Sequence, residues 1–209
     1  MDTKTAGIVL KRQNFGEADR ILKIFTKELG LITAIAKGCR KVKSKRAGCF
    51  ELFTEANFNF HRRTGELFLV TSAAKVQSFE WLDLVALKKI YLAVEWLLTL
   101  VPPEKAVPDI YQLLLDYLTA LKKQNKISLL NIAFKTKLLV QLGFLPDPDS
   151  FGEDVRKVIK FFAQLHFREI SRLEEDQKLL DKIDKELQKT FARETDRVSK
   201  VEVATQGWK

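Results

Sequence analysis

The stretch Phe50-Glu-Leu-Phe-Thr-Glu-Ala-Asn-Phe-Asn-Phe60 carries the clearest structural signal in the chain. Most of its even-numbered positions are apolar, whereas its odd-numbered positions hold Glu51, Glu55, Asn57 and Asn59. An alternation with a period of two residues is typical of a β-strand that buries one face. We therefore predict a strand over residues 50–60 whose even-numbered side chains face a core.

Four more short runs of apolar and β-branched residues flank this stretch. They are Ala6–Arg12, Arg20–Thr26, Leu31–Lys37 and Leu67–Ala73. Turn signals separate them, and Arg63-Thr-Gly-Glu66 predicts a hairpin before the last run. Five short strands at near-regular spacing predict a small closed barrel, of which the oligonucleotide/oligosaccharide-binding (OB) fold is the commonest five-stranded type. An SH3-like barrel stays open as an alternative, because the sequence does not decide the strand connectivity.

From Trp81 onward the apolar residues recur at helical spacing. We predict helices over residues 85–100, 110–121, 128–142, 155–167 and 174–199. The tail, residues 200–209, has no periodicity, and we expect it to fray. The predicted fold class is therefore α+β, with a five-stranded OB-fold barrel over residues 1–80 and an all-α helical bundle domain over residues 81–209.

The net charge of +9 is concentrated in the first part of the chain. Residues 1–80 contain 15 Lys and Arg against 8 Asp and Glu, whereas residues 81–209 contain 21 against 19. A hydrophobic content of 46% with a charged content of 30% is that of a globular protein. The asymmetry indicates a polyanion-binding barrel on a nearly neutral remainder.

A basic run, Lys37-Gly-Cys-Arg-Lys-Val-Lys-Ser-Lys-Arg46, follows the third predicted strand. Six of its ten residues are Lys or Arg, and no acidic residue appears before Glu51. Such a segment cannot be buried, so we predict an exposed loop that a polyanion neutralises. A solvated loop with no ligand is the alternative, because short basic runs have low specificity.

Further basic residues lie at the ends of the predicted strands, where they would converge with this loop into a positive groove. Phe15 in the first turn, and Phe53 on the odd-numbered side of its strand, are candidates for stacking on bases. For Phe53 the alternative is packing against the helical domain. The candidate nucleic-acid-binding residues are Lys11, Arg12, Phe15, Arg20, Lys37, Arg40, Lys41, Lys43, Lys45, Arg46, Arg62 and Arg63.

No catalytic constellation stands out in the sequence. His61 and His166, the only histidines, have no metal-ligand spacing, and there is no phosphate-binding glycine motif. A nuclease would need converging carboxylates, and none are evident. Cys39 and Cys49 cannot by themselves complete a structural zinc site, and they suit a reducing compartment. We therefore expect no enzymatic activity, no cofactor and no bound metal.

The N-terminal residues form no apolar signal-peptide core. The longest apolar stretch, residues 90–101, is interrupted by Glu95 and is too short to cross a bilayer. We therefore expect a cytoplasmic protein without a membrane partner.

Several motifs, in order and at matching spacing, resemble the bacterial DNA repair protein RecO family. They are Thr5-x-Gly-Ile-Val-Leu10, Phe15-Gly-Glu-Ala-Asp-Arg20, Phe25-Thr26, Gly30-Leu-Ile32, Ala36-Lys-Gly38, the basic run ending at Ser44, and Gly65-Glu-Leu67. The resemblance is dense over residues 5–80 and weaker beyond them.

The resemblance implies an N-terminal OB-fold domain, a C-terminal helical domain and a non-catalytic mediator of recombinational repair. It implies binding of single- and double-stranded DNA, annealing of complementary strands, and cooperation with RecR. It also implies contact with the acidic tail of single-stranded DNA-binding protein, indirect help in loading the RecA recombinase, and association with the nucleoid. The implied DNA-contact residues are Arg12, Arg20, Lys37, Arg40, Lys41 and Lys43.

One departure from the family pattern concerns zinc. Many RecO-like proteins carry a four-cysteine zinc module after the segment that matches Leu138–Pro146. Here Pro146-Asp-Pro-Asp-Ser-Phe-Gly152 leads into a predicted helix without a cysteine, as in a shortened, zinc-free member.

Two function classes remain as alternatives: an RNA-binding or ribosome-associated basic barrel protein, and a protein-interaction scaffold whose charge is incidental. In the helical domain Lys135, Lys137 and Arg156 are candidates for contact with an acidic partner peptide. Pairing within the helices or plain solvation is the alternative for each of them.

Overall fold

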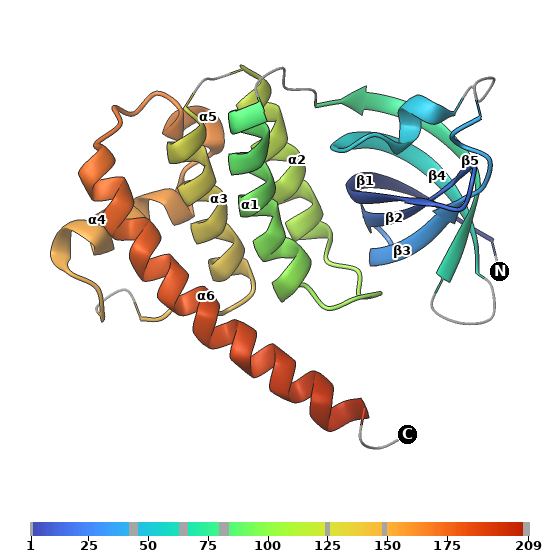
Figure 1. Cartoon of the computed structure of the whole chain (residues 1–209). Helices are drawn as coiled ribbons and strands as arrows, with labels where there is room; N and C mark the ends of the chain where they lie inside the picture. The colour runs from blue at the N-terminus through green and yellow to red at the C-terminus, as the bar shows by residue number, and fades with distance from the viewer. Residues whose placement is uncertain are drawn as a thin grey trace. The chain divides into compact units, whose positions relative to one another are not determined.

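The computed structural model of the chain describes residues 2–41, 46–62, 67–79, 84–123, 126–147 and 150–206. The chain divides into two compact units. Unit 1 consists of Met1–Glu80 with Pro102–Tyr111, and unit 2 consists of Trp81–Val101 with Gln112–Lys209. Strands build unit 1 and helices build unit 2, which confirms the α+β class (Figure 1).

Five strands close into a barrel in unit 1 (Figure 1). They are β1 (Asp2–Phe15), β2 (Asp19–Thr26), β3 (Gly30–Ala36), β4 (Thr54–Arg62) and β5 (Leu67–Ser78). Their order around the barrel is β1-β2-β3-β5-β4. β3 and β5 run parallel, whereas the other neighbouring pairs are antiparallel. This connectivity is that of the OB-fold, so the first of the two predicted barrel types is confirmed.

Aromatic side chains from β4 and β5 fill the interior of the barrel. Phe58 and Phe60 are fully buried, with ring centroids 5.5 Å apart, and Phe68 meets Phe60 edge-on at 6.0 Å. Ala56 belongs to the same buried cluster. The predicted inward face of this strand is therefore confirmed from residue 56 to residue 60.

β4 begins later than the sequence predicts. Phe50 ends a short 3₁₀ helix, η1 (Ala47–Phe50), and the strand starts only at Thr54. Between them Phe53 has a left-handed backbone with a φ of 56°, which interrupts any strand periodicity. The N–H of Phe53 donates to the carbonyl of Val9 at 2.8 Å, so a contact distant in sequence stabilises this turn.

β1 is longer than predicted because it pairs with two strands. It pairs with β4 over residues 2–8 and with β2 over residues 7–15, and a β-bulge lies between Val9 and Lys11. The strand also continues beyond the predicted run, which ends at Arg12, since Asn14 still pairs with Arg20. The bulge changes which side chains of β1 face inward.

The segment Pro102–Tyr111 belongs to unit 1, although the boundary drawn from the sequence after residue 80 assigns it to the helical domain. The N–H of Glu104 donates to the carbonyl of Leu31 at 3.0 Å. Gly30 has a φ of +70°, and a Cβ atom there would lie 2.0 Å from the carbonyl oxygen of Lys105. Only glycine permits this approach.

A buried carboxylate links the end of this segment to the barrel. The hydroxyl of Tyr111 donates to Oε1 of Glu55 at 3.0 Å, and Nε2 of Gln77 donates to Oε2 at 2.7 Å. Glu55 is buried, although its odd-numbered position predicts exposure. Tyr111 and Gln77, both distant in sequence, give each carboxylate oxygen of Glu55 a hydrogen-bond donor.

Unit 2 contains six helices within the described residues. They are α1 (Leu84–Leu100), α2 (Pro108–Lys123, whose first residues belong to unit 1), α3 (Ile127–Gln141), α4 (Glu153–Gln164), α5 (Phe167–Ile170) and α6 (Gln177–Gln206). α3 is the central helix and contacts α1, α4, α5 and α6. Its apolar residues on nearly all sides are therefore buried.

α6 extends beyond the helix end predicted at residue 199 and continues to Gln206, whereas residues 207–209 of the expected tail lie outside the described residues. Between Glu153 and Gln206 the chain contains neither glycine nor proline, and Gly207 is the next glycine. Without a helix-breaking residue, nothing local ends the helix earlier.

We expect Tyr111→Phe to lower the free energy of unfolding by about 1–3 kcal/mol, because it leaves the buried carboxylate of Glu55 with one partner fewer. Urea denaturation followed by circular dichroism measures this loss. The matched control is Tyr91→Phe, since the half-buried Tyr91 hydroxyl makes no hydrogen bond among the described residues. Equal losses in both variants would contradict the role given to Tyr111.

A second prediction concerns Tyr117, which is fully buried and whose hydroxyl donates to Oδ1 of Asn131. Burial raises the pKa of Tyr117 well above 10. The folded state therefore retains a proton that the unfolded chain loses near pH 10. We expect stability to be intact below this pH and to fall above it, by up to about 1.4 kcal/mol per pH unit for this residue. Tyr117→Phe should flatten that part of the pH profile, and an unchanged slope would contradict the prediction.

Candidate nucleic-acid interface

Two turns are held together at one end of the barrel. The N–H of Gly38 donates to Oδ1 of Asp19 at 2.8 Å, and the N–H of Arg40 donates to the carbonyl of Ala18 at 2.9 Å. The guanidinium of Arg40 also reaches the carbonyl of Gly16 at 3.3 Å. The turn between β1 and β2 therefore lies against the start of the basic loop that follows β3.

This arrangement places Phe15 close to exposed cations. Phe15, the last residue of β1, is 51% exposed. Lys37, Arg40 and Lys41, on the neighbouring loop, are exposed as well. Among the described residues, neither Lys37 nor Lys41 forms an ion pair. The turn that carries an exposed aromatic ring thus lies against the loop that carries these lysines.

Lys11 lies on the outer face of β1, directly opposite Lys23 of β2. Both side chains are exposed. Lys23 is not among the binding residues predicted from the sequence. Its place beside Lys11 follows from the pairing register of β1 and β2. This pair adds positive charge to the outer face of the β1–β2 hairpin.

Arg12 and Arg20 take a different position from the lysines. Arg12 lies opposite Leu22, a residue of the barrel core, so both arginines are in inward register at the end of the barrel. Nη1 of Arg20 lies 2.9 Å from Oε1 of Glu51, and Nη1 of Arg12 pairs with the other oxygen of Glu51. Burial, and then the charge of Arg20, lower the pKa of Arg12. Both predicted phosphate contacts are thus already paired with a carboxylate.

Arg46 and Arg62, two further predicted residues of unit 1, have contacts of their own. Arg46 is half-buried and donates to the carbonyl of Thr71 at 2.9 Å. Arg62 pairs with Glu104 at 2.6 Å and lies over the ring of Phe68 at 4.9 Å. No contact among the described residues connects Arg62 with Arg12 or Arg20.

Lys43, Lys45 and Arg63 lie outside the described residues. Phe53 is fully buried, so the base-stacking interpretation of this residue is wrong. Its left-handed backbone takes the side chain out of the alternation of the strand.

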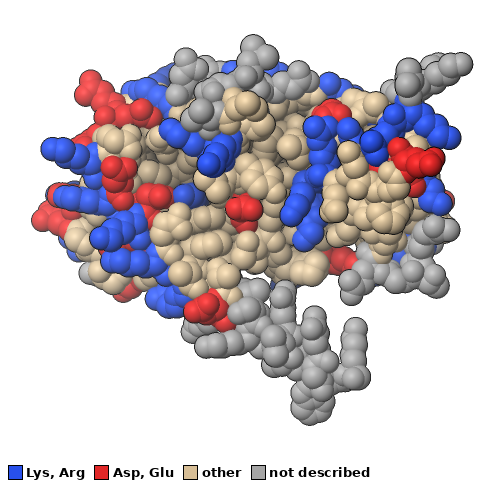
Figure 2. All heavy atoms as spheres, in the orientation of Figure 1, with Lys and Arg blue, Asp and Glu red and all other residues tan. Residues whose placement is uncertain are grey.

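The surface charge is mixed on the visible face. Figure 2 shows Lys and Arg side chains over both units, with Asp and Glu side chains among them. On this face, total charge therefore does not single out a binding surface. The pairing of individual cations is what separates the lysines near Phe15 from the arginines held by Glu51.

In unit 2 two of the predicted partner contacts lie inside the helical packing. Nζ of Lys135 pairs with Asp184 at 2.7 Å and lies over the ring of Trp96 at 4.7 Å. Lys137 donates to the carbonyl of Ala163 at 3.2 Å, and burial lowers its pKa. These contacts explain both lysines without a partner protein. Arg156 is half-buried on α4.

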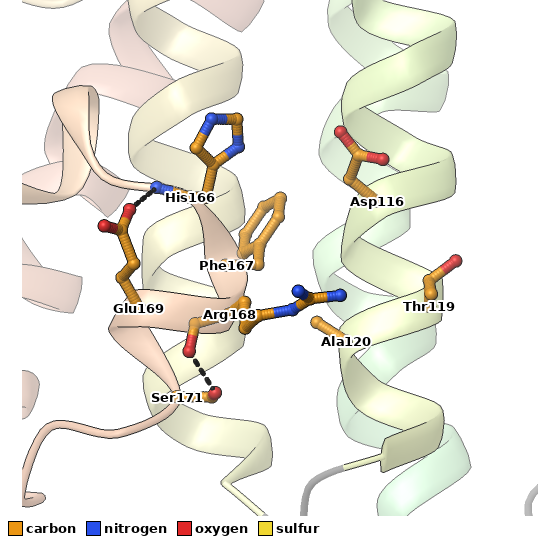
Figure 3. A pocket seen from close by; sticks show the side chains of 8 residues that line it. All are labelled: Asp116, Thr119, Ala120, His166, Phe167, Arg168, Glu169 and Ser171. Carbon is orange, nitrogen blue, oxygen red and sulfur yellow. Dashed lines mark hydrogen bonds between the residues drawn. The ribbon is translucent and has the colours of Figure 1, made fainter.

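A pocket of about 580 Å³ opens between α2 and the segment around α5. Figure 3 shows Asp116, Thr119 and Ala120 on one side of it, opposite His166, Phe167, Arg168, Glu169 and Ser171. Glu169 accepts a hydrogen bond from the backbone N–H of His166 at 2.9 Å. That contact secures the first turn of α5, so this carboxylate has a structural partner.

The described residues show neither a metal centre nor a membrane span. They contain no group of three or more His, Cys, Asp or Glu side chains placed to hold a metal ion. No helix in this part of the chain is long and apolar enough to cross a membrane. Cys39 and Cys49 are both buried in the barrel core, so they do not fit a zinc module in the helical unit.

Comparison with known proteins agrees with this architecture. Residues 1–79 match the family model described as recombination protein O N terminal, and residues 82–151 match the one described as recombination protein O C terminal. A protein named DNA repair protein RecO from Dehalococcoides mccartyi strain 195 is 36% identical over 70% of this chain and 58% of its own length. One of the same name from Caldicellulosiruptor saccharolyticus is 35% identical over 68% of this chain and 59% of its own length.

A third relative of that name, from Rubrobacter xylanophilus, is 33% identical over 72% of this chain and 61% of its own length. The matched part of the chain thus spans about three fifths of the length of these relatives. The two family models together cover most of the chain and divide it near the start of the helical region. The chain therefore belongs to the recombination protein O family.

Proposed function

We propose that this protein is a non-catalytic, DNA-binding mediator of recombinational DNA repair. The observation that carries the proposal is the exposed ring of Phe15 at the β1–β2 turn, which contacts the loop that carries the exposed Lys37, Arg40 and Lys41. Membership of the recombination protein O family supports DNA as the polyanion.

The chemistry of this surface suits a nucleic-acid strand. Lysine ammonium groups without acidic partners can neutralise phosphates and release their counterions. Stacking on an exposed aromatic ring contributes about 1–3 kcal/mol per base and tolerates any base. Neither kind of contact reads base edges, so we expect binding with little sequence preference.

Such binding is compatible with strand annealing. A surface that holds phosphates leaves the Watson–Crick edges of the bases free to pair. Neutralising part of the phosphate charge also lowers the repulsion between two approaching strands. We therefore propose that the protein binds single- and double-stranded DNA and promotes pairing of complementary strands.

The proposed partners follow from the family. We propose that the helical unit cooperates with RecR and with the acidic tail of single-stranded DNA-binding protein, and that it assists RecA loading indirectly. This role implies a cytoplasmic protein associated with the nucleoid. A barrel with phosphate contacts and a stacking residue also suits RNA, which makes RNA binding the alternative to test.

We expect Lys37→Gln/Arg40→Gln/Lys41→Gln to weaken binding of a fluorescent dT oligonucleotide about 10- to 100-fold at low salt. The slope of log K against log salt should become shallower by about 2, because up to three phosphate contacts are lost. The control carries the same charge change at exposed positions of α6, Lys178→Gln/Lys182→Gln/Lys185→Gln. Equal losses in both variants would show that only total charge matters.

The same variants also test annealing and the choice of nucleic acid. Wild type and the α6 control should accelerate pairing of complementary oligonucleotides at low salt, and the barrel variant should not. Affinities for single-stranded DNA, duplex DNA and structured RNA are compared at one salt concentration. A strong preference for RNA would replace the DNA proposal with the RNA-binding alternative.

We expect Phe15→Ala to weaken single-stranded DNA binding by about 5- to 100-fold, because a stacking contact is lost. Duplex DNA should be affected by less than about 2-fold, since its bases are already stacked and only phosphates are contacted. Val76→Ala, which removes an exposed apolar side chain from β5, is the matched control. An equal loss for both forms of DNA would contradict a stacking role.

A further inference from the structure

Arg12 and Arg20 share a single carboxylate at the end of the barrel. Oε1 of Glu51 pairs with Arg20 at 2.9 Å, and Oε2 pairs with Arg12. Each oxygen thus takes one guanidinium. A phosphodiester likewise presents two charged oxygens and one negative charge to its partners. Glu51 therefore occupies the place in which one phosphate group would meet both arginines.

Without an anion between them, the two arginines would repel each other. Their inward register brings two positive charges close together above the barrel core. The side chain of Arg20 is only 17% exposed, so water screens its charge poorly. An anion held between the guanidiniums offsets their mutual repulsion.

Arg20 retains a donor that Glu51 does not use. Among the described residues, Nε of Arg20 is a buried nitrogen without a hydrogen-bond partner. Its Nη1 reaches the carbonyl of Phe50 only at 3.5 Å. A carboxylate has two oxygens, whereas a phosphodiester has four and can offer an acceptor to a further N–H. Glu51 thus leaves one N–H donor of the site, Nε of Arg20, without an acceptor.

The carboxylate of Glu51 can leave without a change of fold. Its side chain is 43% exposed, so solvent is directly accessible to it. Its backbone carbonyl accepts a hydrogen bond from the N–H of Thr54 at 3.2 Å, which holds the main chain in place. Rotation of the side chain alone would free both guanidiniums.

We propose that Arg12 and Arg20 form a subsite for one phosphodiester group, and that Glu51 occupies it in the DNA-free protein as an internal competitor. This inference deepens the proposed function and rests on it for the identity of the ligand. DNA displaces the carboxylate, so Glu51 weakens binding and confines it to ligands that can offer a phosphate in its place.

Binding of a fluorescent dT oligonucleotide tests the competitor. Glu51→Gln should bind about 10-fold more tightly than wild type, with a salt slope steeper by about 1, because in wild type the displaced carboxylate takes up a counterion and in the variant no carboxylate is displaced. Glu28→Gln, the same charge change at the exposed turn between β2 and β3, should change affinity by less than about 2-fold. In Glu51→Gln/Arg12→Gln the gain should disappear. An equal gain in Glu28→Gln, or a gain that survives in the double variant, would overturn the proposal.

Inorganic phosphate tests the subsite independently of DNA. About 50 mM phosphate should raise the melting temperature of Glu51→Gln by a few degrees relative to chloride at equal ionic strength, but not that of Glu28→Gln. If wild type binds no DNA while phosphate still stabilises Glu51→Gln, the proposed function fails and the subsite stands. If wild type binds DNA but Glu51→Gln shows neither tighter binding nor stabilisation, the subsite fails and the proposed function stands.

Discussion

Closure of the barrel through β1 is the constraint on which unit 1 depends. This strand pairs with β4 over its first half and with β2 over its second half, so it joins the two ends of the sheet. At the crossover Gly7 pairs with both Thr26 and Ala56. A Cβ atom on Gly7 would lie 2.8 Å from Cγ2 of Ile24, so the neighbouring side chains leave no room for a side chain at this position. Because every strand of the closed barrel has two neighbouring strands, no edge strand is left free to pair with other chains.

The bulge in β1 connects this closure with the candidate binding surface. One extra residue between Val9 and Lys11 shifts the alternation, so that Lys11 lies on the outer face and Arg12 in inward register. The basic residues of the barrel therefore form two groups with different environments. The outer lysines are open to solvent, whereas the arginines are held by Glu51 at the end of the core.

In unit 2, Lys135 and Lys137 take part in the helical packing. Lys135 lies between Asp184 of α6 and Trp96 of α1, and Trp96 in turn stacks on Phe191 at 4.4 Å. A buried ammonium needs both its counterion and the aromatic face to offset desolvation. The family model ends at residue 151, yet α4, α5 and α6 beyond it pack on α3. The region outside the matched range thus completes the helical core.

The sequence by itself determined the fold class, the five strands, most of the helices and the family. These features depend on local periodicity and on motifs at fixed spacing, which the chain carries in order. Only the tertiary structure decided the left-handed turn at Phe53, the burial of Glu55 and the pairing of Arg12 and Arg20 with Glu51. The partners in these contacts lie 22 or more residues apart in the chain. Strand periodicity describes which way a side chain points, but the charge that a side chain meets depends on which strands close around it.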